Sequence, residues 1–225
     1  MPLNHLLRRL PAVEARLLAG LGKQVELQAH QAWASRGQAT RTLLFPESGC
    51  LALTVPMDAH APLGLQLVGR EGCVGAHRLL GHPASPVGAQ VQATGLAFCI
   101  PATRLSPHWL TFPKLRRLLL RDVQAQWAQA AQASACQRFH SVEQRLARWL
   151  LMSFDRADGV EVRLTHDELA QRLGVRRSGV TVAAGRLQRA QAIHIHRGLL
   201  TLTDRARLAS AACTCLRGGN WPTAT

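Results

Sequence analysis

The chain has 225 residues, 47% of them hydrophobic, so it can form one large domain or two modest ones with sizeable cores. Its 27 Lys and Arg residues against 13 Asp and Glu give a formal charge of +14. That charge favours a polyanionic partner such as nucleic acid or an acidic membrane surface, although codon bias could also enrich arginine. No apolar run is long enough for a membrane span or the core of a signal peptide. We therefore expect a soluble, cytoplasmic protein with reduced cysteines and no membrane partner.

The first half of the chain predicts a short helix followed by β-structure. Residues 1–22 form an amphipathic pattern, and the helix is expected to end at Gly20 or Gly22. From 24 to 104, the short apolar runs RTLLF, GCLALTV, LGLQLVG and AQVQATGLAFCI alternate with Gly- and Pro-rich turns such as FPESG and GHPASPVG. Short strands at this spacing are typical of a β-sandwich or a β-barrel.

After Pro113 the chain runs for 26 residues without Gly or Pro, which predicts one long helix. Its apolar side chains recur every three or four residues and form one narrow seam. We expect this seam to pair with a second copy of the chain, and packing on the protein's own β-region is the alternative. The seam consists of Leu115, Leu118, Leu119, Val123 and Trp127. A second helix, SVEQRLARWLLMSFDRADG, is expected to end at Gly159.

The next segment carries a helix start signal. The run GVEVRLT predicts a short strand, and Thr165 and Glu168 then form a T-x-x-E capping box, in which each side chain bonds the backbone N–H of the other residue. The helix 166–173 should bury Leu169, Ala170 and Leu173. Gly174 supplies the tight turn that follows.

A second helix follows this turn and is expected to reach about Ala190. It should bury Val180, Ala184 and Leu187. The run AIHIHRGLLTLTD then alternates around Arg197 and Gly198, which is a β-hairpin signal. Helix, short turn, helix and hairpin is the order of a winged helix-turn-helix.

In this motif the first turn of the second helix enters the major groove of DNA. Arg176 and Arg177 lie there, and an arginine can bind guanine O6 and N7 in a bidentate fork or bind a phosphate. A merely solvated surface of arginines is the alternative. The expected DNA contacts are Arg176, Arg177, Ser178, Thr181, Val182 and Arg186 on the second helix, Thr165 and His166 at the start of the first helix, and Arg197 at the hairpin tip.

Two glycines weaken the second helix. Gly179 and Gly185 each cost about 1 kcal/mol relative to alanine in a helix interior. We expect Gly179 to permit close approach to DNA and Gly185 to permit close approach to the neighbouring helix.

These residues carry a family likeness. The last 80 or so residues, with SVEQRLARWLL, LAQRLGVRRSGVT and the late AACTC, closely resemble the C-terminal part of bacterial Crp/Fnr-type transcription regulators. Upstream, FPESGCLAL and GREGCVG look like sheet motifs of the effector domain in the same family. The resemblance implies a homodimer that binds a pseudo-palindromic site on double-stranded DNA, and RNA polymerase is a further candidate partner.

The chain departs from the family pattern where an effector would bind. Cyclic-nucleotide binders in the family use a Gly-Glu pair for the ribose and an Arg-Ser or Arg-Thr pair for the cyclic phosphate. Here the corresponding stretches read Gly75-Ala76-His77 and Ala84-Ser85-Pro86-Val87, so the carboxylate and the arginine are both missing. We therefore expect no dependence on cyclic AMP. An iron–sulfur cluster is also not expected, because the first cysteine is Cys50 and the N-terminal cysteine group is absent.

Other groups of reactive residues are weaker signals. His194 and His196 share a strand face but offer too few ligands for a metal site, and the sequence contains no C-x-x-C pair of the kind that binds zinc. Cys213 and Cys215 resemble a redox pair, although the family likeness favours an ordinary C-terminal segment. The β-region lacks the His-x-His motif of the cupin metal enzymes. We therefore expect no cofactor, no metal and no catalysis.

The sequence thus predicts an α+β protein in three parts. These are a cyclic-nucleotide-binding-like double-stranded β-helix (jelly-roll) effector-type domain at 1–112, a dimerisation helix at 113–137 and a winged helix-turn-helix domain at 138–225. The predicted function is sequence-specific DNA binding in transcription regulation. The alternative is a small-molecule- or metal-binding β-barrel protein, with an enzyme as one form of it, whose C-terminal domain mediates protein interaction. The effector, the operator and the sign of regulation are not encoded in any motif of the chain.

Overall fold

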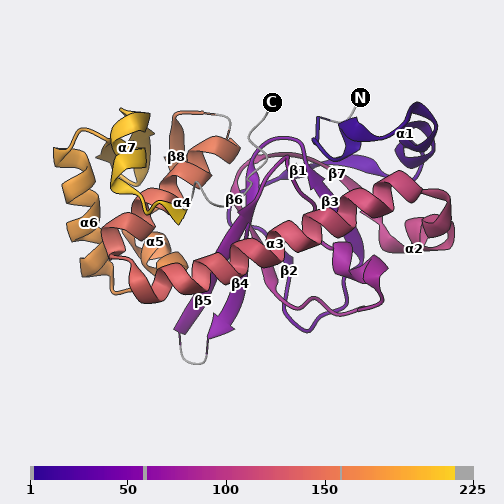
Figure 1. Ribbon diagram of the computed structural model, residues 1–225, viewed down its shortest axis with the longest axis horizontal. Helices are drawn as coiled ribbons and strands as arrows, with labels where there is room; N and C mark the ends of the chain where they lie inside the picture. The colour runs from indigo at the N-terminus through magenta and orange to yellow at the C-terminus, as the bar shows by residue number, and fades with distance from the viewer. Residues whose placement is uncertain (1–2, 58–59, 158, 216–225) are drawn as a thin grey trace. The chain divides into compact units, whose positions relative to one another are not determined.

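The computed structural model describes residues 3–57, 60–157 and 159–215 (Figure 1). The chain divides into two compact units. The first unit consists of Met1–Leu53 and Leu67–Trp127, and the second of Thr54–Gln66 and Ala128–Thr225. The predicted α+β class, with an N-terminal β-domain, a long helix and a C-terminal winged helix-turn-helix, is confirmed. Of the helices in the described ranges, none combines the length and the apolar character needed to cross a bilayer.

The N-terminal segment is broken where a single helix was predicted. It forms a 3-10 turn, η1 (Leu7–Arg9), and a helix, α1 (Ala12–Ala19), that ends at Gly20. The break lies at Pro11, which caps α1 and leaves Leu10 in an extended conformation. A proline has no backbone N–H and disfavours a helical conformation in the residue before it, so the apolar pattern could not continue as one helix.

In the described part of this region, seven strands build two sheets, ordered β1-β7-β3 and β2-β6-β4-β5, and the pairs β1–β7, β3–β7 and β2–β6 are antiparallel. The strands are β1 (Lys23–Leu27), β2 (Ala32–Ala34), β3 (Thr42–Pro46), β4 (Cys50–Met57), β5 (His60–Val68), β6 (Gly88–Ala93) and β7 (Gly95–Pro101). The short helices η2 (Ala76–Leu80), α2 (Ala102–Leu105) and η3 (Ser106–Thr111) connect and follow them. The four apolar runs of the sequence all lie in strands, and the last run forms two strands instead of one.

Two glycines hold these strands close together. Gly49, in the predicted FPESG turn, has a positive φ of 68°. A Cβ on Gly95 would collide with the carbonyl oxygen of Ser48. The backbone therefore approaches most closely where β6 gives way to β7, which explains why AQVQATGLAFCI is divided at this glycine.

The long helix α3 (Pro113–Phe139) confirms the predicted 26-residue helical run. Its first half contributes three fully buried leucines, Leu115, Leu118 and Leu119, to a core shared with α1 and the β1-β7-β3 sheet. The protein's own β-domain therefore covers this part of the seam, which was the alternative expectation. Trp127 is 73% exposed and Leu120 is 52% exposed. Dimerisation stays a prediction.

Two buried carboxylates fix the first half of α3. Glu14 in α1 accepts hydrogen bonds from the backbone N–H groups of Lys114 and Leu115, each at 3.0 Å, and so satisfies donors that every helix start leaves open. Asp122 accepts bonds from the backbone N–H of Cys73 at 3.1 Å and from Gln126 Nε2 at 2.8 Å. Burial raises the pKa of Asp122 to about 7, and these two hydrogen bonds oppose the rise.

The second unit has the predicted order of a winged helix-turn-helix. Its elements are α4 (Val142–Ala157), β8 (Glu161–Arg163), α5 (His166–Leu173), α6 (Arg177–Arg189), β9 (Ile193–His196), β10 (Leu199–Leu202) and α7 (Arg205–Ala211). The strands form one small sheet in the order β8-β10-β9. Helix α4 contacts α5, α6, α7 and β8, so it is the central element of this unit.

Candidate nucleic-acid interface

Helix α5 begins and ends as the sequence predicted. Thr165 Oγ1 accepts a bond from the backbone N–H of Glu168 at 3.2 Å, and the Glu168 carboxylate accepts one from the Thr165 N–H at 2.7 Å. Gly174 then adopts a left-handed conformation with φ 61°, where a side chain would be strained. The capping box and the glycine turn therefore fix the angle at which α6 leaves α5.

Helix α6 has one buried face and one exposed face. Val180, Ala184 and Leu187 are fully buried, as predicted, and α6 packs on α4 and α5 through this face. The side chains of Arg176, Ser178 and the other candidates on α6 lie on the opposite, exposed side. All nine predicted DNA contacts are exposed except His166, which is partly buried.

The start of α6 concentrates positive charge. Arg176 occupies the N-cap position, and no side chain in the described part of the chain caps the first N–H groups of α6. Arg177 lies 3.5 Å from Asp167, and both side chains are largely exposed. This carboxylate offsets the unfavourable placement of a cation at the positive end of a helix. Among the described residues no carboxylate pairs with Arg176, so an outside anion can reach it freely.

A polar contact ties the beginning of α5 to α6. The Thr181 hydroxyl donates to the carbonyl oxygen of Arg177 at 3.1 Å, so His166 Nδ1 donates to the same hydroxyl oxygen at 3.0 Å. The Thr181 proton is thus already used, so its hydroxyl could donate to a base only by giving up the bond to Arg177, although its oxygen can accept one more bond. Val182 is 55% exposed beside it and presents an apolar surface.

Two arginines flank this centre. Arg186 pairs with Glu143 at 3.2 Å on the exposed surface of the second unit. Arg197 lies at the tip of the β9–β10 hairpin with φ 47°, followed by Gly198 with φ 78°. Positive φ at both central residues is the signature of a two-residue hairpin turn, so the predicted wing is confirmed.

The expectation for Gly185 is wrong. Among the described residues, a Cβ at this position would meet only Arg189 Nη1 of the same helix, at 3.6 Å, and no atom of a neighbouring helix. For Gly179, nothing in the described part of the chain lies within 4 Å of a Cβ. The surface of α6 is therefore open at both glycines. No contact within the described part of the chain explains why these positions are glycine.

The first unit contains a pocket of about 250 Å³ with a mixed polar and apolar lining. Thr40, Arg41, Thr42 and His77 line it, and Thr40 Oγ1 lies 2.7 Å from His77 Nε2. Burial and the nearby His82 lower the pKa of His77. Ser85 is buried, and its hydroxyl donates to the carbonyl oxygen of Val87 at 2.6 Å.

The other candidate ligands are rearranged. His194 and His196 are both exposed on β9 and belong to no group of three ligating residues within the described ranges. Cys213 and Cys215 instead lie beside Cys136 and His140. The sequence analysis missed this group, although the one-turn spacing of Cys136 and His140 was a visible signal.

The C-terminal part of the chain matches a family model. Residues 144–211, from α4 to α7, match the Crp-like helix-turn-helix domain. Among curated proteins, none matches the sequence.

Solved structures share the fold of nearly the whole chain. A Crp/Fnr-family transcriptional regulator from Eubacterium rectale is similar with a TM-score of 0.71 and 16% identity, over 92% of this chain and 97% of its own. The c-di-GMP responsive global regulator CLP of Xanthomonas campestris has a TM-score of 0.69 and 17% identity, over 86% and 100%. A CRP/FNR-family regulator from Thermus thermophilus has a TM-score of 0.67 and 23% identity, over 84% and 98%.

The fold and the interface define a winged helix-turn-helix protein with a cationic second helix. Residues 144–211 are a Crp-like helix-turn-helix domain, and the fold of nearly the whole chain is similar to that of Crp/Fnr-family transcription regulators. The helix-turn-helix match indicates a DNA-binding regulator rather than the enzymatic β-barrel that the sequence had left open.

The two exposed glycines of α6 give a matched pair of variants. Gly179→Ala and Gly185→Ala should each raise the free energy of unfolding by about 0.5–1 kcal/mol, because both positions have room for a Cβ and alanine favours the helix. Urea unfolding measures this gain. Only Gly179→Ala should weaken DNA binding in a gel-shift assay. Equal DNA affinity for both variants would contradict a close approach of DNA at Gly179.

Proposed function

We propose that the protein is a homodimer that binds a pseudo-palindromic DNA site, with one α6 helix in the major groove of each half-site and RNA polymerase as a further partner. The supporting observation is the N-terminal turn of α6, where Arg176 and Arg177 are exposed and no side chain of the described ranges caps the helix. A helix start with free N–H groups and two guanidinium groups is suited to a polyanion.

The exposed residues divide into two roles. Arg176, Arg177, Ser178 and Val182 lie on the first two turns and are the proposed contacts to base edges. Thr165, His166, Thr181, Arg186 and Arg197 are the proposed contacts to phosphates. The His166–Thr181 bond supports this division, because it holds the two helix starts in a fixed register before DNA arrives.

The proposed dimer contact is the exposed side of α3. Leu120 and Trp127 lie seven residues apart, which places them on one face two turns from each other. They are among the most exposed large apolar side chains of the helix, whereas Leu115, Leu118 and Leu119 are used inside the first unit. A second copy of α3 would cover this face.

We also propose that DNA binding does not depend on cyclic AMP. The described residues that line the pocket of the first unit include no carboxylate for a ribose, and Arg41 is their only arginine. The Ser85 hydroxyl donates to the carbonyl oxygen of Val87 in its own loop, and Ala76 or His77 stands where the family uses a glutamate. Arg41 would thus be the only guanidinium that the described lining offers to a phosphate, and burial of an incompletely paired phosphate is costly.

Variants on α6 should separate base contacts from phosphate contacts. Arg177→Ala should cost about 1–3 kcal/mol on the preferred site and relax the preference at one base position. Arg186→Ala should weaken binding to all sequences alike and reduce the salt dependence by about one ion. Selection from random DNA followed by gel-shift titrations at several salt concentrations measures both. The proposal fails if the wild-type protein selects no preferred sequence.

Cyclic AMP provides a separate test. At millimolar cyclic AMP, the affinity for the selected DNA site and the melting temperature of the protein should both stay unchanged, because the described lining has no carboxylate for the ribose and Ala84 replaces the arginine of the family's phosphate pair. An increase in DNA affinity of about tenfold or more, or a clear stabilisation, would show that the pocket accepts the nucleotide by another arrangement.

Trp127→Glu should dissociate the dimer, because it places a charge on the proposed apolar contact. Light scattering coupled to size-exclusion chromatography measures the mass, and the affinity for a full palindrome should fall with it. Leu110→Glu is the control, since Leu110 in η3 is 76% exposed but lies off this face of α3. A dimer that survives Trp127→Glu would rule out this contact.

A further inference from the structure

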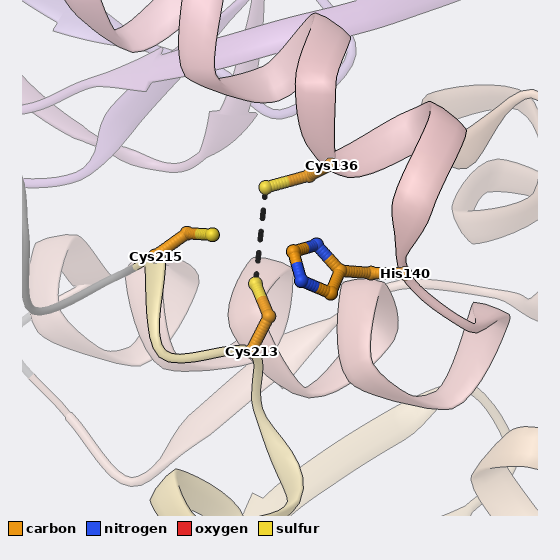
Figure 2. Close-up of side chains that lie close together, drawn as sticks. All are labelled: Cys136, His140, Cys213 and Cys215. Carbon is orange, nitrogen blue, oxygen red and sulfur yellow. Dashed lines mark hydrogen bonds between the residues drawn. The ribbon is translucent and has the colours of Figure 1, made fainter.

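Four ligating side chains from distant parts of the sequence meet in the second unit. Cys136 lies in the last turn of α3, His140 follows its end, and Cys213 and Cys215 follow α7 (Figure 2). One ligand atom from each residue, three sulfurs and an imidazole nitrogen, lies within 4.8 Å of all the others. Figure 2 shows all four side chains directed toward one common centre.

The spacing suits a single tetrahedral ion. Zinc–thiolate bonds of about 2.3 Å place two sulfurs of a tetrahedral site roughly 3.8 Å apart. The sulfurs of Cys136 and Cys213 lie 3.9 Å apart. A disulfide requires about 2.05 Å, and all described cysteines are free thiols. An iron–sulfur cluster would hold its thiolates farther apart, because the irons and bridging sulfides lie between them.

A second observation points to a ligand at this place. His140 Nδ1 is buried and has no hydrogen-bond partner. An unsatisfied buried nitrogen is costly, and coordination of a cation through its lone pair removes that cost. The backbone N–H of His140 donates to the carbonyl oxygen of Cys136 at 3.1 Å, so the two residues extend the helix by one turn and share a face.

The surroundings favour an anionic site. A zinc ion with three thiolates and one neutral imidazole has a net charge of −1, and Arg148 supplies a buried positive charge close by. Burial and the neighbouring Cys136 raise the pKa of Cys213 to about 11, whereas Arg148 lowers it. A metal ion binds the thiolate form of cysteine, so metal binding has to release the thiol protons.

We propose that Cys136, His140, Cys213 and Cys215 form a structural zinc site that fastens the end of α3 to the segment after α7. Four protein ligands complete the tetrahedron and leave no open position for substrate, which is the mark of a structural site. The site is independent of DNA binding, since none of its ligands lies on the exposed face of α6.

The test is zinc content of the full chain purified under reducing conditions. Elemental analysis should give about one zinc per chain. Cys215→Ser and His140→Ala should each lower zinc affinity by more than about tenfold in competition with a chelator. Cys99→Ala is the matched control, because this buried cysteine lies outside the cluster, and it should keep its zinc. His140→Cys should restore binding through a fourth thiolate.

Cobalt spectra and melting temperatures test the site even if a variant fails to fold. The wild-type protein titrated with Co²⁺ should develop the intense visible bands of tetrahedral cobalt–thiolate coordination, and chelation should lower its melting temperature but not that of Cys215→Ser. The proposal is overturned by a wild-type chain that binds no more zinc than the variants, by octahedral cobalt spectra, or by the absorbance of an iron–sulfur cluster.

Discussion

The arrangement of the DNA-binding unit depends on the burial of α4. Every residue of α4 from 146 to 154 is buried, including Trp149 and Phe154, so this helix is apolar or enclosed on all sides. Helices α5, α6 and α7 and strand β8 all pack on it. Helix α6 buries Val180 and Leu187 by turning this face toward α4, and the same orientation leaves its arginine face in solvent. The hydrophobic effect in the centre of the unit thus orients a polar surface at its edge.

Much of this unit could be predicted because its signals are local. Three features depend only on neighbours within a few residues: the Thr165 capping box, Gly174 at a positive φ and the Arg197-Gly198 turn. A local sequence pattern is therefore enough to predict each of them. The predicted buried faces of α5 and α6 are also confirmed, since the helical repeat decides which side chains share a face. The candidate contact residues were therefore correctly expected on the exposed side.

The errors concern partners that are distant in the sequence. The seam of α3 predicts an apolar face but does not say what covers it, and the β-domain turned out to use its leucines. Gly185 was assigned to a helix contact that does not exist. Cys136 and Cys213 are 77 residues apart, so no local spacing could join them into one group. In the N-terminal segment a local signal, Pro11, was available and outweighed the apolar pattern.

Asp167 has a consequence for discrimination between DNA sequences. Its carboxylate lies 3.5 Å from Arg177, so it attracts that side chain and repels any phosphate that approaches the start of α6. Arg177 would therefore contribute less to the affinity for non-specific DNA than an arginine without a neighbouring carboxylate. A guanine edge, which offers two aligned acceptors, can still draw the guanidinium away. In the proposed DNA complex, this acidic residue beside α6 would thereby lower the general affinity for DNA and widen the difference in affinity between correct and incorrect sites.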